Sequence, residues 1–119
     1  MSSEARFHVK RIDYIMKDIV ERFCEIAKQK YSCQIEKIVL FGSVARGEKN
    51  KDSDIDLLIV WRGNKKKAWD SLEKIAFPLV LESKKYLSLK LIGLQEFKKM
   101  EKIGSPFVQN IKREGINLV

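Results

Sequence analysis

The chain has 119 residues, of which 45% are hydrophobic and 34% are charged, and its formal net charge is +8. This length suits one domain, and the composition excludes a disordered or membrane-embedded chain. No segment approaches the roughly 18–20 consecutive apolar residues that a membrane span requires, and the N-terminus lacks a secretory pattern. We therefore expect a single cytoplasmic domain over residues 1–119, with no membrane partner.

The positive charge favours an anionic partner, such as a nucleotide, a nucleic acid or an acidic protein. The basic residues are scattered along the chain, and the densest run, at 64–67, borders a turn. Because the sequence has no aromatic-rich sheet face and no recognition-helix signature, it does not favour nucleic acid as the partner. The two cysteines, Cys24 and Cys33, are too few for a zinc knuckle.

The first predicted helix covers about Val9 to Lys28, where apolar residues recur at spacings of three and four. After a polar break, residues 35–41 are short and β-branched, which predicts a strand that ends at Gly42. Residues 43–47 are expected to form a short helical turn. Residues 48–53 are all polar or charged, which predicts an exposed loop.

The second strand is predicted at residues 54–61, and it should lie inside a sheet because both of its faces are mostly apolar. Residues 66–83 carry a helical apolar stripe. Pro78 lies inside this stripe and predicts a kink or a division into two helices. A third strand is expected at 86–92 and a further helix at 94–102.

A last helix should open at Ser105-Pro106 and end at Gly115, followed by a short extended tail at 116–119. This order of elements predicts an α/β (or α+β) domain. Its core should be a small mixed sheet of three or more strands flanked by helices.

The most informative stretch is FGSVARGEKNKDSDIDLLIV, residues 41–60. Asp54 and Asp56 are two positions apart on one strand, so they project from the same face and can share a hard divalent cation. Such an ion, Mg²⁺ or Mn²⁺, is usually held by a few carboxylates together with substrate phosphates. Without a cation, two aspartates on one face of so apolar a strand would repel each other.

The Gly-Ser turn supplies groups for the phosphates. Gly42 lets the backbone approach a ligand closely, while the Ser43 hydroxyl and the N–H groups of the turn can donate to phosphate oxygens. Arg46 can add a charge-assisted contact. A Gly-Ser turn alone is weak evidence, but a turn and paired carboxylates together predict phosphoryl or nucleotidyl transfer.

The run GSVARG at 42–47, followed by SDIDLLI at 53–59, resembles the signature of the nucleotidyltransferase superfamily that includes DNA polymerase beta, and in particular its minimal members. The resemblance is strong over about residues 35–60 and loose elsewhere. It implies a nucleotidyltransferase-like fold. It also implies transfer of a nucleoside monophosphate from an NTP to a hydroxyl of a protein or a small molecule.

The resemblance also implies roles for single residues. Gly42, Ser43 and Arg46 would bind the triphosphate, and Asp54 and Asp56 would be the catalytic residues that ligate Mg²⁺. Small members of the family often act beside a helical HEPN-type partner, as in toxin–antitoxin pairs, which makes such a protein a possible partner here.

The sequence departs from the family pattern in the third predicted strand. Family members that catalyse usually present a third carboxylate there, but residues 86–92 contain none. The position falls on Ser88 or on Lys90, which share one face of the strand. Glu82 precedes the strand and Glu96 lies beyond it, so both are poor substitutes by reach, although a rearranged loop could bring in either one.

This departure leaves two hypotheses. In the first, the chain is an active nucleotidyltransferase. In the second, it is a catalytically degenerate, antitoxin-like module that binds a nucleotide or a HEPN-type partner, since a lysine directed into the site would compete with a metal for Asp54 and Asp56. A domain of this size has little room for an acceptor pocket, so the second substrate is expected against a partner or across a homo-oligomer interface.

Overall fold

The computed structural model describes residues 14–47 and 54–119. The start of the first predicted helix, residues 9–13, and the predicted loop at 48–53 lie outside these ranges. In chain order the elements are α2 (Tyr14–Tyr31), β1 (Ile35–Phe41), α3 (Gly42–Ala45), β2 (Ile55–Trp61), α4 (Lys65–Ser83), β3 (Leu87–Gly93), α5 (Leu94–Lys102), α6 (Pro106–Glu114) and β4 (Ile116–Asn117).

The strands form one mixed sheet in the order β3-β2-β1-β4. β1 pairs antiparallel with both β2 and β4, whereas β2 and β3 are parallel. A parallel pair needs a long crossover connection, and α4 provides it. The expected small mixed sheet with flanking helices is confirmed, and the extended tail joins it as β4.

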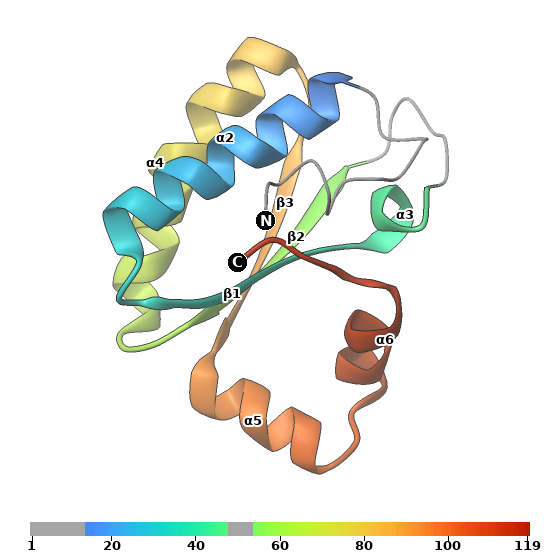
Figure 1. Ribbon diagram of the computed structural model, residues 1–119. Coiled ribbons are helices and arrows are strands. Elements are labelled where there is room, and N and C mark those ends of the chain that lie inside the picture. Colours follow the sequence, from blue (N-terminus) through green and yellow to red (C-terminus); the bar gives the residue numbers. More distant parts are fainter. Residues whose placement is uncertain (1–13, 48–53) are drawn as a thin grey trace.

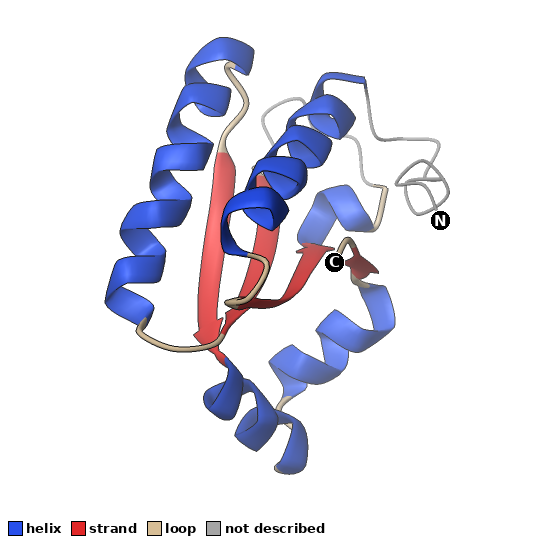
Figure 2. Cartoon of the chain, turned by 60° about the vertical axis from the view of Figure 1, so that its left-hand side comes forward, coloured by secondary structure: helices blue, strands red, loops and turns tan. Residues whose placement is uncertain are grey.

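The helices cover both faces of the sheet. α2 and α4 lie side by side on one face, and α5 and α6 lie on the other (Figures 1 and 2). β2 is central and contributes to both layers: Ile55, Leu57 and Ile59 belong to the core under α2 and α4. Leu58 and Val60 belong to the core under α5 and α6. The apolar residues on both faces thus explain the interior position of this strand.

The same alternation places Asp56. It precedes Leu58 and Val60 on the face of β2 that is covered by α5 and α6, but it lies at the start of the strand, beyond the apolar core. α3 follows β1 at this same end of the sheet (Figure 1). The predicted turn and the predicted carboxylates therefore share one end of the domain.

Most predicted bounds differ from the observed ones by two residues or fewer, and two larger points differ in α2 and α4. α2 continues to Tyr31, three residues beyond the predicted end. α4 is one helix with Pro78 inside it, so of the two outcomes predicted for Pro78, a kink or a division, the division is excluded. Pro78 is exposed, and at such a position the carbonyl group that loses its helical donor can bind water.

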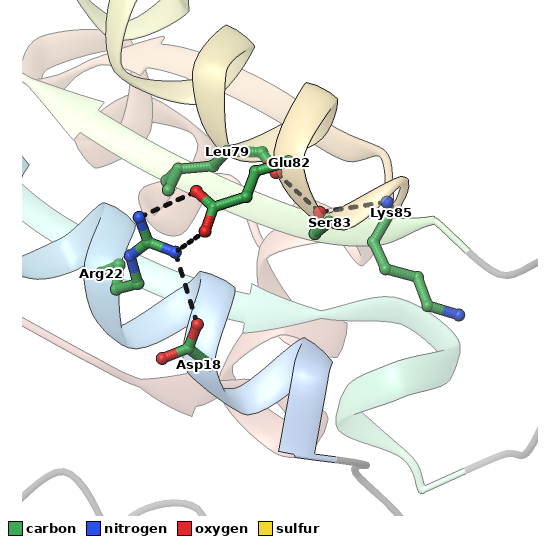
Figure 3. A network of polar contacts seen from close by, with 6 residues as sticks. All are labelled: Asp18, Arg22, Leu79, Glu82, Ser83 and Lys85. Atoms are coloured by element: carbon green, nitrogen blue, oxygen red, sulfur yellow. Dashed lines mark hydrogen bonds and ion pairs between the residues drawn. The ribbon is translucent and has the colours of Figure 1, made fainter.

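A polar network joins the two long helices (Figure 3). The Arg22 guanidinium of α2 donates two hydrogen bonds to the Glu82 carboxylate of α4, at 3.1 and 3.0 Å. Asp18, one turn earlier on α2, lies 3.5 Å from the same guanidinium. Among the described residues, no helix is both long enough and apolar enough to cross a membrane.

Candidate functional site

The Gly-Ser turn lies directly against a carboxylate. Gly42 has a φ of +75°, a conformation that L side chains rarely adopt, and a Cβ atom at this position would overlap the Asp56 carboxylate. The contact follows from the register, because Phe41 at the end of β1 pairs with Asp56 on β2. Only glycine therefore lets the turn start this close to the carboxylate.

Asp56 is half-buried and Asp54 is exposed. Burial raises the pKa of Asp56, and the charge of Asp54 raises it further, whereas a hydrogen bond from Ser88 and the charge of Arg46 lower this pKa. The two carboxylates are thus close enough to repel each other, as their spacing predicted. A bound cation would relieve this repulsion.

The strand register decides between the two positions considered for a third carboxylate. Ser88 on β3 pairs with Asp56, and its side chain hydrogen-bonds the Asp56 carboxylate. Lys90 pairs with Leu58, farther from the end of the sheet that carries Asp54 and Asp56. Its ammonium lies 4.9 Å from the centre of the Phe107 ring. Ser88 is therefore the residue of β3 that stands beside the aspartates.

The two glutamates that were weighed as substitutes are engaged elsewhere. Glu82 binds Arg22 on α2. Glu96 lies 3.4 Å from the ammonium of Lys65, at the start of α4. In this structure neither glutamate is therefore placed beside Asp54 and Asp56.

The donors that the site offers to a metal are oxygens. Within residues 14–47 and 54–119, no group of three or more His, Cys, Asp or Glu side chains could hold a metal ion. What the chain brings together is the pair Asp54 and Asp56, with the Ser88 hydroxyl beside Asp56. Such a set fits Mg²⁺, which commonly takes one or two carboxylates and completes its octahedron with water and substrate phosphates.

Arg46 follows the turn and connects it to the last helix. Its guanidinium lies 3.5 Å from the Glu114 carboxylate at the end of α6. A pocket of about 250 Å³ separates the turn from this helix. The side chains of Phe107, Asn110 and Glu114 line the pocket opposite Phe41, Gly42 and Arg46.

These α6 residues were missed by the sequence analysis. They lie about sixty positions beyond the turn, and they follow the ordinary spacing of an amphipathic helix. No local pattern separates a residue that lines a pocket from one that packs on a sheet, so only the fold could bring them to the turn.

Taken together, the geometry defines a class of protein: an α/β domain with a mixed sheet whose Gly-Ser turn touches a pair of carboxylates on the neighbouring strand. Sequence comparison then gives the family. The profile of the "Nucleotidyltransferase domain" family matches residues 17–118, and the chain belongs to this family.

Curated relatives agree with this assignment. MJ1379 of Methanocaldococcus jannaschii, named for protein adenylyltransferase activity, is 31% identical over 102 residues, which are 85% of this chain and 91% of that protein. MJ0604 of the same organism, named for the same activity, is 51% identical over 41 residues. That second match spans 34% of this chain and 41% of MJ0604.

A solved structure confirms the nucleotidyltransferase-like fold. A crystal structure of a mutant of the toxin–antitoxin complex MntA–HpeT superposes with a TM-score of 0.52 at 16% sequence identity. The superposition covers 83% of this chain and 71% of the other. At this identity the likeness concerns the fold alone.

Proposed function

We propose that the chain binds a nucleoside triphosphate with Mg²⁺ and transfers the nucleoside monophosphate to a hydroxyl group of a protein or a small molecule. The observation that carries this proposal is the contact between the turn backbone at Gly42 and the Asp56 carboxylate. It sets groups that can hold phosphates beside groups that can hold the metal. The relatives named as protein adenylyltransferases support ATP as the donor and a protein as the acceptor.

Each side chain has a role in this proposal. The Ser43 hydroxyl and the turn N–H groups donate to the phosphates, and Arg46 neutralises part of their charge. Asp54 and Asp56 would hold Mg²⁺, and Ser88 orients the Asp56 carboxylate through its hydrogen bond. When bound, Mg²⁺ offsets the charge of the triphosphate and lowers the pKa of the attacking hydroxyl.

The reaction exchanges a phosphoanhydride bond for a phosphoester bond. The acceptor oxygen forms a bond to the α-phosphorus, the bond from this phosphorus to the bridging oxygen breaks, and pyrophosphate leaves with the electron pair. The proton of the acceptor hydroxyl passes to water. Positioning and charge neutralisation provide most of the catalysis in reactions of this kind.

One experiment tests this function directly. The chain is incubated with ATP labelled at the α-phosphate, Mg²⁺ and a cell extract, and label on macromolecules and small molecules is measured. We expect transfer that Asp54→Asn or Asp56→Asn abolishes. Asp70→Asn, which changes an exposed aspartate on α4, should leave transfer unchanged. Label that is equal in all four proteins would contradict the proposal.

A second candidate function is favoured by Ser88. Where catalytic members of the family usually present a carboxylate, this chain presents a hydroxyl. A domain that holds a nucleotide without transferring it, or that binds a helical HEPN-type partner, would need no third carboxylate. The structural neighbour belongs to a toxin–antitoxin complex, which supports this alternative. Saturable MgATP binding without label transfer, together with copurification of a helical protein, would favour it.

A further inference from the structure

The pocket between the turn and α6 shares Gly42 and Arg46 with the proposed phosphate site, but its α6 side has no role in the proposal so far. We propose that it holds the nucleobase of the donor NTP, with Phe41 and Phe107 as its aromatic wall and Asn110 as the residue that reads the base. This inference rests on the proposed function, because it concerns the part of the same nucleotide that lies beyond the triphosphate.

The position of the pocket supports this assignment. Gly42 and Arg46 belong both to the turn and to the pocket wall, so the pocket opens beside the groups that would hold the phosphates. Its volume of about 250 Å³ is slightly below the roughly 300 Å³ at which pockets for whole small ligands begin. The pocket therefore suits one part of a ligand, such as a planar heterocycle, rather than a whole nucleotide.

The walls have the composition that a nucleobase requires. The rings of Phe41 and Phe107 lie 5.8 Å apart at 89°, in an edge-to-face arrangement that fixes both side chains. Ile111 adds aliphatic surface, and Asn110 and Glu114 add polar groups at the rim. Aromatic and aliphatic surface with a few placed polar groups is typical of ligand pockets, and bases stack well on aromatic rings.

Asn110 is held in position by its own helix. Its Oδ1 atom accepts a hydrogen bond of 2.6 Å from Arg113, one turn later on α6. An amide oxygen can accept a second hydrogen bond, and an amide nitrogen offers two donors. This combination matches the N6 amino group and the N7 acceptor of adenine, whereas guanine presents two acceptors, O6 and N7, on the same edge. We therefore expect Asn110 to favour ATP over GTP.

A larger pocket elsewhere is a weaker candidate. It measures about 350 Å³, lies between α4 and β3, and is lined by Trp69, Phe77 and Tyr86 among others. It reaches Ser88, but its lining includes none of the turn residues at 42–46. A base bound there would lie away from a triphosphate held at the turn. Trp69→Ala therefore serves as a control that should not change ATP affinity.

The test compares a whole nucleotide with its phosphate part. Binding of ATP and of inorganic tripolyphosphate, each with Mg²⁺, is measured by calorimetry on the full chain. Asn110→Trp should fill the pocket and weaken ATP binding about tenfold or more, with tripolyphosphate binding unchanged. Gln109→Trp places the same side chain on the neighbouring exposed position of α6 and should change neither affinity.

A milder variant guards against misfolding. Asn110→Leu keeps a similar side-chain size and removes the amide, so the preference for ATP over GTP should shrink about tenfold. Tripolyphosphate binding should stay the same.

Three outcomes are informative. If Asn110→Trp leaves ATP affinity intact, or weakens ATP and tripolyphosphate equally, the base does not lie in this pocket. A loss of ATP affinity in Trp69→Ala alone would point to the other pocket. If the unmodified chain binds neither ATP nor tripolyphosphate, the proposed function fails, and the base assignment fails with it.

Discussion

Gly42 has a backbone conformation that favours glycine, and it also contacts the Asp56 carboxylate of the site. Its positive φ is disfavoured for an L side chain, and a Cβ atom there would also displace the Asp56 carboxylate. Gly63 has a positive φ as well, at +96°, but a Cβ atom at that position meets nothing within 4 Å. Substitutions at these two glycines therefore distinguish the effect of backbone strain from the effect of a clash with the Asp56 carboxylate.

We predict that Gly42→Ala lowers the free energy of unfolding by about 1–3 kcal/mol and also weakens MgATP binding. Gly63→Ala should show a smaller loss of stability, from backbone strain alone, without any change in binding. Urea unfolding and calorimetric titration measure the two effects. Equal ATP affinity in both variants would show that the contact between the turn and Asp56 is unimportant for binding.

Ser88 occupies the position on β3 at which a third carboxylate would lie beside Asp54 and Asp56. It pairs with Asp56 across the parallel strands, whereas Lys90 pairs with Leu58. A carboxylate introduced at position 88 would therefore lie beside Asp56, and one at position 90 would not.

We predict that Ser88→Asp lowers the melting temperature in the absence of metal, because a third negative charge adds to the repulsion between Asp54 and Asp56. Mg²⁺ should restore this stability, so the metal-dependent rise in melting temperature should exceed that of the unmodified chain. Faster transfer of label from ATP is expected in the same variant. Lys90→Asp is the matched control; if its response to Mg²⁺ equals that of Ser88→Asp, the register does not determine the metal site.

This distinction could not be made from the sequence. Side chains alternate with period two, so Ser88 and Lys90 share a face whatever the register, and the alternation cannot choose between them. The choice depends on how β3 slides against β2, and the 19-residue helix α4 separates these two strands. The hydrophobic pattern excludes a slip of one residue, which would exchange the two faces of β3, but it does not exclude a slip of two residues.

For whole helices and strands, the local sequence pattern predicted the bounds correctly where a single clear signal marks them. The strand at 35–41 and the helix at 94–102 have the predicted bounds, since a glycine ends the strand and the helix has a clear polar–apolar periodicity. Of the two outcomes predicted for Pro78, a division of α4 does not occur, because the apolar residues on either side of it belong to one core. Tertiary packing thus outweighed the local effect of proline.

The ion pair between α2 and α4 gives an element-level prediction. Hydrogen bonds from Arg22 and its charge lower the pKa of Glu82. Because the pKa is lower in the folded state, the pair contributes stability above the unfolded-state pKa. This contribution is lost as the pH falls through the folded-state value.

We predict that Glu82→Gln is less stable than the unmodified chain near neutral pH, that the difference shrinks as the pH falls below the unfolded-state pKa of about 4.3, and that it vanishes once the folded-state carboxylate is protonated. The effect should be small, because both side chains are exposed to solvent. Urea unfolding across a pH series measures it. Glu25→Gln, at an exposed position of α2, is the comparison; a stability gap for Glu82→Gln that persists at low pH would contradict the ion-pair explanation.

For the whole molecule, the question is whether anions bind at one site or over the general basic surface. The net charge of +8 attracts any polyanion and speeds its encounter with the protein. Attraction by scattered charges weakens steeply with salt, whereas a ligand held through a metal and a turn depends on specific side chains. The Gly-Ser turn and the carboxylates lie together at one end of the sheet, where β1 ends and β2 and β3 begin.

We therefore predict that MgATP at about 100 times its dissociation constant raises the melting temperature by on the order of 10 °C, since ligand binding to the folded state alone contributes about 2.7 kcal/mol. Chelation of Mg²⁺ or the Asp56→Asn substitution should remove most of this rise at constant ionic strength. A polyanion such as heparin should stabilise the chain and its Asp56→Asn variant equally, and 0.5 M salt should abolish that effect. The rise in melting temperature with MgATP could instead be unaffected by Asp56→Asn and abolished by salt, as expected for heparin. In that case the basic surface binds MgATP, and the carboxylate pair has no part in holding the nucleotide.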